Sequence, residues 1–331
     1  MNETKITNSK AEIFLGVDGG QSHTEAVIAD ENGNVLGRGF GGASNHAEHP
    51  GGRERLRNAV LASVGEALKN AGLLSPEKIV FAAAHFGMTG GADFKREIIG
   101  EIVKAGHLRV GHDAPTALFG ATAGKPGIVV IAGTGSVVYG ENERGELAQI
   151  GGLGYLFSDE GSGFWLAAQV VRLAIREQDG LIEPAGLQEL VLDFFERQKI
   201  REVTNDFYFS KISRDKLASF AQAAHDAALR GNEVIKEQIK RGALVLVESV
   251  VSAARRLKFE ESFPVAGIGG MFRGELMKRY FTESLNESNA AAVYAEPQFS
   301  PPFGALLLAY KQAKIEISDN LLINLEKSQI K

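Results

Sequence analysis

The chain has no cysteine. This absence excludes disulfides, thiolate zinc sites, iron–sulfur clusters and cysteine nucleophiles. No apolar run approaches the ~20 residues that a membrane-spanning helix needs. The opening residues, MNETKITNSK, also lack the apolar core of a signal peptide. We therefore expect a cytoplasmic protein with no membrane partner.

Strong charge of either sign is also missing. The formal net charge is −5 at pH 7, from 36 basic and 41 acidic residues. This mild acidity argues against nucleic acid as the main partner. The P-loop pattern GxxxxGK[ST] does not occur, so a phosphate would have to be bound in another way. None of the seven histidines has zinc-site spacing, and we assign them no metal-ligand role.

Glycine, in contrast, is abundant, with 39 of 331 residues, and much of it follows apolar strands. Residues Ile128–Ala132 predict a strand, Gly133-Thr134-Gly135-Ser136 a turn, and the residues from Val137 a second strand. The same order of strand, glycine turn and strand appears earlier, where the turn DGGQS separates the predicted strands Ile13–Val17 and Thr24–Ala29. A turn with so few side chains lets backbone N–H groups approach a phosphate closely.

The order of predicted elements also repeats. Three strands are followed by helix, strand, helix, strand and helix, and the whole order then recurs, which indicates an internal duplication. We therefore expect an α/β protein with two domains. The predicted ranges are 1–117 for the first domain, 118–299 for the second, 184–258 for a helical insertion in the second, and 300–314 for a helix that packs back on the first.

A duplicated unit with two glycine hairpins resembles the actin–hexokinase–Hsp70 class of ATP-binding folds. The stretches IFLGVDGGQSHTEAVIAD, GASNH, HDA, GIVVIAGTGSVVYG, SDEGSGFW and AGIGGMF are similar to the N-acetylglucosamine kinase group of the BadF/BadG/BcrA/BcrD ATPase family, in family order from about Ile13 to Tyr310. The resemblance implies a duplicated actin-like (ribonuclease H-like) ATPase fold, with two domains flanking a nucleotide cleft. It also implies ATP and Mg²⁺ as cofactors.

The resemblance assigns roles to the glycine turns. Asp18 would hold Mg²⁺, directly or through water, and oxygen ligation suits that ion. Read alone, Asp18 could equally be an Asx-turn residue, and each glycine pair an ordinary tight turn. The implied phosphate and nucleotide residues are Gly19, Gly20 and Ser22 in the first turn, Gly133, Thr134 and Gly135 in the second, and Gly269 and Gly270 on the adenosine side.

Asp113 matches the general base of the family, which takes the proton from the sugar hydroxyl. Its alternative reading is the N-cap of the following helix. Its position at the C-terminal end of a strand, where open α/β sheets bind ligands, favours catalysis. Asn45 could be an ordinary surface-loop residue, and Asp159 could cap a helix. The implied sugar ligands are Asn45, Thr89, Gly90, Asp113, Ser136, Gly152, Leu153, Gly154 and Asp159.

The chain departs from the family where many relatives carry Trp at Leu153 and Gly at Ser158. Both changes lie close to the expected sugar site, so they bear on substrate identity more than on phosphoryl transfer. We expect an ATP-dependent kinase for the 6-hydroxyl of an amino sugar, N-acetylglucosamine first, with glucosamine, N-acetylmuramic acid or glucose as alternatives. A non-catalytic nucleotide or sugar sensor is the alternative from another class. The helical region offers surface for a homodimer.

Overall fold

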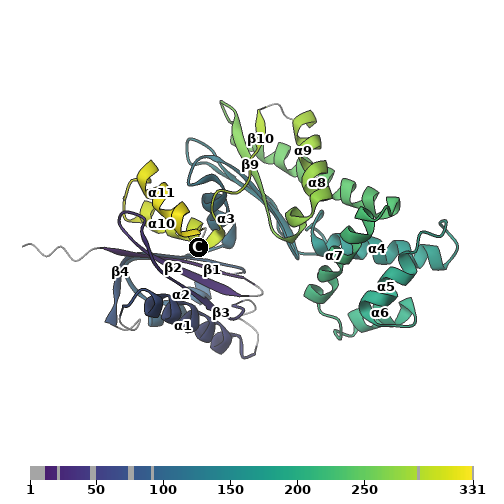
Figure 1. The fold of residues 1–331 in the computed structure, drawn as a ribbon, viewed down its shortest axis with the longest axis horizontal. Coiled ribbons are helices and arrows are strands. Elements are labelled where there is room, and N and C mark those ends of the chain that lie inside the picture. Colours follow the sequence, from purple (N-terminus) through teal and green to yellow (C-terminus); the bar gives the residue numbers. More distant parts are fainter. Residues whose placement is uncertain are drawn as a thin grey trace, which may run out of the picture. The chain divides into compact units, whose positions relative to one another are not determined.

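The computed structural model describes residues 12–20, 23–44, 50–73, 78–90, 93–288 and 291–329. The chain divides into two compact units (Figure 1). Unit 1 comprises Met1–Lys125 and Gln298–Lys331, and unit 2 comprises Pro126–Pro297. The sequence placed this division between 117 and 118. The structure places it later because helix α3 (Asp113–Thr122) runs through that position and packs against α10.

Unit 1 is built on a mixed sheet in the order β3-β2-β1-β4-β5. Strand β1 is antiparallel to β2 and parallel to β4. The fully buried strands β1 and β2 carry nearly continuous apolar runs because both faces of the sheet are covered. The bounds are β1 Ile13–Gly19, β2 Thr24–Asp30, β3 Val35–Gly41, β4 Val80–Met88 and β5 Lys104–Gly111.

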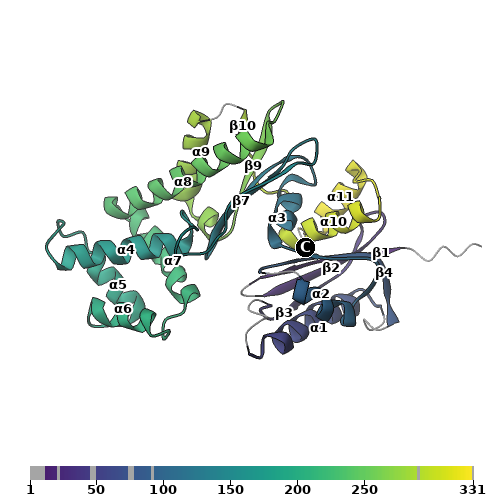
Figure 2. The ribbon, with the colours of Figure 1, turned by 180° about the vertical axis from the view of Figure 1, so that it is seen from behind.

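Helices cover both faces of this sheet (Figures 1 and 2). Helices α1 (Gly52–Asn70) and α2 (Asp93–Ile102) pack on one face. Helices α3, α10 (Pro301–Gln312) and α11 (Asp319–Gln329) bury a second cluster on the other. The C-terminal helix therefore belongs to unit 1. Helix α11 lies in the tail that the sequence left unassigned, and its Leu321 and Leu325 are buried in the second cluster.

Unit 2 repeats the arrangement with the sheet order β10-β9-β6-β7-β8. Strand β6 is antiparallel to β7 and parallel to β9, as β1 is to β2 and β4. This repetition confirms the predicted α/β fold and its internal duplication. The bounds are β6 Gly127–Ala132, β7 Ser136–Glu141, β8 Leu147–Gly151, β9 Phe263–Ile268, η2 Gly270–Arg273 and β10 Ala292–Tyr294.

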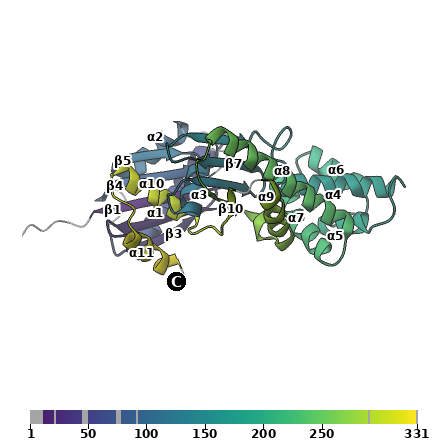
Figure 3. The same cartoon turned by 90° about the horizontal axis from the view of Figure 1, so that it is seen from above.

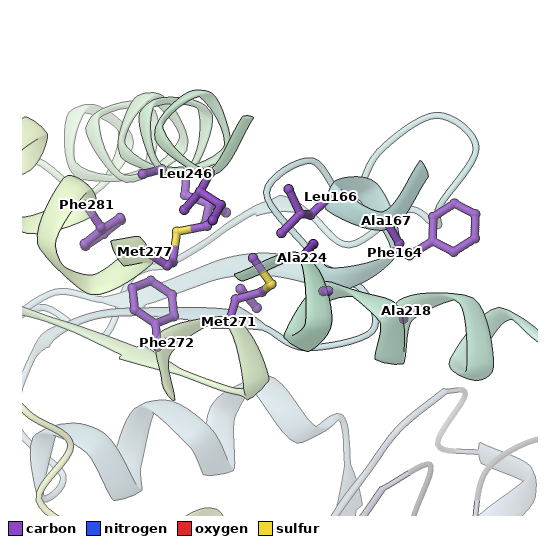
Figure 4. Packing of buried hydrophobic residues seen from close by; sticks show 14 of the residues in the cluster. Phe164, Leu166, Ala167, Ala218, Ala224, Leu246, Met271, Phe272, Met277 and Phe281 are labelled. Carbon is purple, nitrogen blue, oxygen red and sulfur yellow. The ribbon is translucent and has the colours of Figure 1, made fainter. Parts of the chain in front are cut away.

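The core of unit 2 joins its sheet to α8 (Glu233–Leu257) and α9 (Glu275–Ser288). Figure 4 shows Phe272, Met277 and Phe281 close together, with Leu246 of α8 above them. The rings of Phe272 and Phe281 meet edge to face, with their centroids 5.1 Å apart. Such contacts fix the Gly269–Gly270 segment against the sheet.

Four further helices gather beside this sheet (Figure 3): α4 Gly163–Gln178, α5 Leu187–Phe195, α6 Ile200–Tyr208 and α7 Arg214–Leu229. The predicted insertion 184–258 included α8. The structure shows instead that α8 contacts β6, β7 and β8, much as α1 contacts β2 and β3. Helix α8 is therefore the crossover helix before β9, and α4–α7 are the added group. Among the described residues, no helix is long and apolar enough to cross a membrane.

The end of β4 lies beside the first glycine turn. Strand β5 begins at Lys104, after α2 ends at Ile102, and pairs with β4 from Val80 onward. Gly87 is the residue of β4 that pairs with Asp18. The last residues of β4 therefore bring Thr89 directly beside this turn.

Candidate active site

Asp18 lies near the end of β1, between two neighbouring strands. It pairs with Glu25 on β2 and with Gly87 on β4. Because Asp18 is part of this ladder, the strand rather than an Asx turn fixes its place. Burial raises the pKa of Asp18 to about 7, and the carboxylates of Asp113 and Glu25 add to the effect. A carboxylate in this setting favours a cation beside it.

The first glycine turn is held by backbone hydrogen bonds. The carbonyl of Gly19 accepts from the N–H of Thr89 at 2.9 Å, and the N–H of Gly20 donates to the carbonyl of His23 at 2.9 Å. A Cβ on Gly19 would lie 2.5 Å from the sulfur of Met88, so the Met88 side chain packs directly against this glycine. Ser22 and Asn45, predicted phosphate and sugar ligands, lie outside the described residues.

Asp113 is the first residue of α3, and His112 rather than Asp113 occupies the N-cap position. The N-cap reading is therefore wrong. The Asp113 carboxylate accepts a hydrogen bond of 2.8 Å from the hydroxyl of Thr89. The buried ammonium of Lys95 donates to the backbone carbonyl of Thr89. Gly90, which has φ +85°, lies beside this ammonium. Thr89, predicted on the sugar side, thus holds the carboxylate of Asp113.

Asp18 and Asp113 are the carboxylates that could serve a Mg²⁺ ion in unit 1. Among the residues that the structure describes, no group of three or more His, Cys, Asp or Glu side chains could hold a metal ion. Mg²⁺ is usually bound through one or two carboxylates, with water and substrate phosphates completing its shell. A buried Asp18 with Asp113 as its neighbour fits that pattern.

In unit 2, the second glycine turn is fixed against the start of α4. The carbonyls of Gly133 and Thr134 accept from the N–H groups of Gly163 and Phe164, at 2.8 and 3.3 Å. The N–H of Gly133 donates to the carbonyl of Gly135 at 2.9 Å. Backbone hydrogen bonds therefore tie the turn to the start of α4.

The Gly269–Gly270 turn lies directly beside this one. Gly269 has φ +98°, and a Cβ there would lie 2.5 Å from the carbonyl oxygen of Ala132 and 3.1 Å from the nitrogen of Gly133. A Cβ on Gly270 would have no atom within 4 Å. The structure thus brings together two segments that are far apart in the sequence, and each exposes backbone with almost no side chains.

Asp159 lies in the loop after β8 in the left-handed conformation, with φ +58°. Its side chain accepts from the N–H of Gly154 at 3.3 Å. Burial raises the pKa of Asp159, and the nearby Arg214 and backbone hydrogen bonds from Gly154 and Ser136 partly offset that rise. Ser162 caps α4 with its side chain, which accepts from the N–H of Trp165. The helix-cap reading of Asp159 is therefore wrong.

A cavity of about 190 Å³ lies beside Asp159, between this loop and α8. Ser136 lines it, but the Ser136 hydroxyl already donates to the carbonyl of Glu160 at 2.7 Å. Gly152 and Gly154 have φ +74° and +99°. Leu153, between them, is 81% exposed. Four of the sugar-side predictions, Gly152, Leu153, Gly154 and Asp159, thus lie in one loop.

Two residues that contact the predicted site carried no signal in the sequence. Arg214 begins α7, and its guanidinium lies against Gly135 and Asp159. Lys95 lies in α2, where its periodicity suggests an ordinary helix surface, yet it is only 3% exposed. Both act across tertiary contacts, so no local pattern could have identified them.

Comparison with known proteins identifies the family of this chain. The model of the BadF/BadG/BcrA/BcrD ATPase family matches residues 15–309. An N-acetylmuramic acid/N-acetylglucosamine kinase of Clostridium acetobutylicum is 28% identical, over 89% of this chain and 97% of the relative. An N-acetyl-D-glucosamine kinase of Dictyostelium discoideum is 26% identical, over 92% of this chain and 99% of the relative.

Solved structures give the same fold. A Chromobacterium violaceum protein assigned as an N-acetylglucosamine kinase superposes with a TM-score of 0.72 and 27% identity, over 90% of this chain and 99% of that one. A ROK family glucokinase of Streptomyces griseus, solved with glucose and AMPPNP, superposes with a TM-score of 0.56 and 16% identity, over 90% and 99%. The latter likeness confirms the actin-like ATPase fold.

Proposed function

Because the chain belongs to the BadF/BadG/BcrA/BcrD ATPase family, we propose that it is an ATP-dependent sugar kinase. It transfers the γ-phosphate of ATP to the 6-hydroxyl of an amino sugar, with N-acetylglucosamine as the first candidate. The observation that carries this proposal is the Asp113 carboxylate, which is fixed by Thr89 and lies near the buried Asp18.

Asp113 is the general base in this proposal. It takes the proton of the sugar hydroxyl while that oxygen attacks the γ-phosphorus. Thr89 fixes the carboxylate, and Asp113 is the first residue of α3. Asp18 would hold Mg²⁺, which neutralises charge on the phosphates. Phosphoryl transfer needs mainly positioning and charge neutralisation, so few side chains suffice.

In this proposal, unit 2 also contributes to binding. The turns Gly133–Gly135 and Gly269–Gly270 carry almost no side chains, which lets phosphates and the nucleoside approach their backbone closely. Asp159 and the loop around it would bind ring hydroxyls of the sugar. Leu153 is smaller than the Trp of many relatives, which leaves room for a larger substituent. N-acetylmuramic acid is therefore the main alternative acceptor, and the name of the Clostridium relative includes that sugar.

The test is ADP release with Mg-ATP and a panel of sugars: N-acetylglucosamine, glucosamine, N-acetylmuramic acid, N-acetylmannosamine, glucose, and none. Asp113→Asn should lower sugar-dependent kcat by about 10²- to 10⁴-fold, because it removes the base and keeps the shape. Asp319→Asn is the matched control, since Asp319 also begins a helix of unit 1 but is exposed. It should leave kcat within about twofold, as surface changes usually do.

The outcomes separate the alternatives. Turnover with one sugar that collapses in Asp113→Asn, while thermal unfolding stays unchanged, supports the kinase and identifies its acceptor. Equal kcat in Asp113→Asn and wild type would contradict the role of Asp113. A protein that binds ATP and a sugar but turns over neither would instead be a sensor.

A further inference from the structure

Arg214 brings a guanidinium group to the second glycine turn from α7, which has no counterpart among the described helices of unit 1. It is the first residue of α7, directly after the N-cap Ser213. A Cβ on Gly135 would lie 3.1 Å from Nη2 of Arg214 and 2.6 Å from Oδ2 of Asp159. The guanidinium and the carboxylate therefore both lie against the backbone of Gly135, inside unit 2.

This guanidinium is poorly satisfied by its neighbours. Its Nη2 lies 4.0 Å from Oδ2 of Asp159, which is too far for a hydrogen bond. Its Nε is buried and has no hydrogen-bond partner among the described residues. Its Cζ lies 5.5 Å from the centre of the Tyr155 ring, which supports the flat face of the group. Arginine carries five N–H donors, so bonding capacity remains beside the turn.

Arg197 shows what a structural arginine looks like in the same helical group. Its Nε donates to Asp206 at 2.9 Å, and its Nη1 donates to the carbonyls of Phe195 and Glu196 at 3.1 and 3.0 Å. The side chains of Arg197 and Arg214 are similarly exposed, at 37% and 32%. Arg197 uses its Nε and Nη1 in hydrogen bonds to its neighbours, whereas the Nε of Arg214 has no hydrogen-bond partner among the described residues.

We propose that Arg214 binds a γ-phosphate oxygen of the nucleotide and stabilises the phosphoryl group during transfer. This inference rests on the proposed function and adds a catalytic residue to it. A planar guanidinium matches phosphate oxygens, and an arginine supplied within the same chain can stabilise this transition state. The bond from the sugar oxygen to phosphorus forms, the bond from phosphorus to the β–γ bridging oxygen breaks, and Asp113 takes the sugar proton.

Because Asp159 lies nearby, Arg214 has a possible second role in sugar binding. A sugar bound to Asp159 would place its hydroxyls beside the guanidinium of Arg214. Arg214 therefore stands between the carboxylate proposed for the sugar and the turn proposed for the phosphates. A purely structural role, in which Arg214 only orients Asp159, would affect sugar binding rather than phosphoryl transfer.

The test combines kinetics with direct nucleotide binding. Arg214→Met should lower sugar-dependent kcat by about 10²- to 10³-fold, a modest value for an arginine at this transition state. Arg214→Lys should recover about tenfold of that loss, because lysine keeps the charge without the fork. Arg197→Met is the matched control and should keep kcat within about twofold. Calorimetry without sugar should show weaker binding of Mg-AMPPNP and unchanged binding of ADP in Arg214→Met.

A double variant separates the two roles of Arg214. If Arg214 acts on phosphate, Arg214→Met lowers kcat equally in the wild-type and Asp159→Asn backgrounds. If it acts only through Asp159, the double variant is no slower than Asp159→Asn, and the inference is overturned. Sugar turnover that Arg214→Met leaves unchanged also overturns it, with the kinase proposal intact. Loss of AMPPNP preference in a protein that turns over no sugar supports the inference and rejects the kinase proposal.

Discussion

The two units share one strand order but place different chemistry at equivalent positions. Asp18 precedes the first glycine of one turn, whereas Ala132 precedes the first glycine of the other. His85 lies opposite Gly16 in unit 1, and Gly267 lies opposite Val130 in unit 2. At these two positions unit 1 carries ionisable side chains, whereas unit 2 carries alanine and glycine.

Under the proposed function, the two duplicated halves have different chemical roles. Carboxylates suit proton transfer and a metal ion, so they belong with the attacking hydroxyl. Backbone N–H groups and a guanidinium suit the oxygens of the phosphates. In unit 2 the cationic side chain comes from the added helices α4–α7, which unit 1 lacks. Changes at equivalent positions of the two units should therefore have different consequences.

The largest expected difference concerns the free energy of unfolding when the glycine near the end of β9 or of β4 is replaced. Gly269→Ala should lower the free energy of unfolding by about 3 kcal/mol, because φ is +98° and the Cβ would meet the Ala132 carbonyl. Gly270→Ala is the control, since its Cβ would have no atom within 4 Å. Urea unfolding of both variants measures the effect. Equal stability of the two variants would contradict it.

The equivalent glycine of unit 1 sharpens this result. A Cβ on Gly87 would overlap the side chain of Thr116, rather than backbone. Thr116→Ala should therefore restore most of the stability that Gly87→Ala loses. Gly269→Ala has no such partner to remove, because backbone carbonyls are present in every variant. A Gly87→Ala variant that Thr116→Ala leaves unchanged would show that the obstruction lies elsewhere.

The second prediction concerns pH and the buried histidine of unit 1. Burial lowers the pKa of His85 from 6.5 to about 4, with Arg109 contributing. Between these pH values the unfolded chain takes up a proton that the folded chain does not. Stability is therefore lost as pH falls below 6.5, by about 2 kcal/mol at pH 5. His85→Gln should remove this dependence, as measured by urea unfolding from pH 7.5 to 5.

Asp18 titrates in the same pH range, so the experiment on His85 needs a control variant. Burial raises its pKa to about 7, so its contribution runs the other way and stability rises as pH falls from 7 towards 4. The difference between variant and wild type isolates His85. His107→Gln, at an exposed position of β5, should leave the wild-type dependence in place. The same slope in His85→Gln and wild type would mean that His85 takes up its proton in the folded protein.

The sequence predicted the duplicated fold because its signals are local. Each glycine turn follows an apolar strand, and the order repeats, so the pattern and the family resemblance agree. The exposed helix of the C-terminal tail escaped prediction because its stripe is short, with Leu321 and Leu325 as its buried residues. Helix α8 looked like part of an all-helical insertion because contact with a sheet leaves little trace in helical periodicity.

The sequence indicates which carboxylates lie at strand ends, as Asp18 and Asp113 do, and their roles stay predictions. The hydrogen-bond partners that arise only from tertiary contacts could not be predicted from the sequence. Thr89 was assigned to the sugar, yet its hydroxyl holds Asp113. Ser136 was assigned to the sugar, yet its hydroxyl is used by Glu160. A sequence motif names the residue types at a site, but it does not show which partner each polar group has already taken.

The smallest effect concerns the support of the base in unit 1. Lys95 donates to the Thr89 carbonyl, and the Thr89 hydroxyl donates to Asp113. Lys95→Met should lower sugar-dependent kcat about five- to tenfold through loss of this positioning, roughly 1 kcal/mol. The KM for ATP should change less than kcat, because Lys95 is bonded to Thr89 rather than to a residue proposed to bind phosphate. Steady-state kinetics with both substrates varied would measure the split.

Lys104 provides the control for that experiment. Its ammonium also donates to a backbone carbonyl, that of Gly100 at 2.6 Å, but it is exposed and touches no residue of the site. Lys104→Met should therefore leave kcat unchanged. An equal loss in both variants would attribute the effect to general loosening of α2 and β5. A loss confined to Lys95→Met would show that the position of Asp113 depends on the side chains of Lys95 and Thr89.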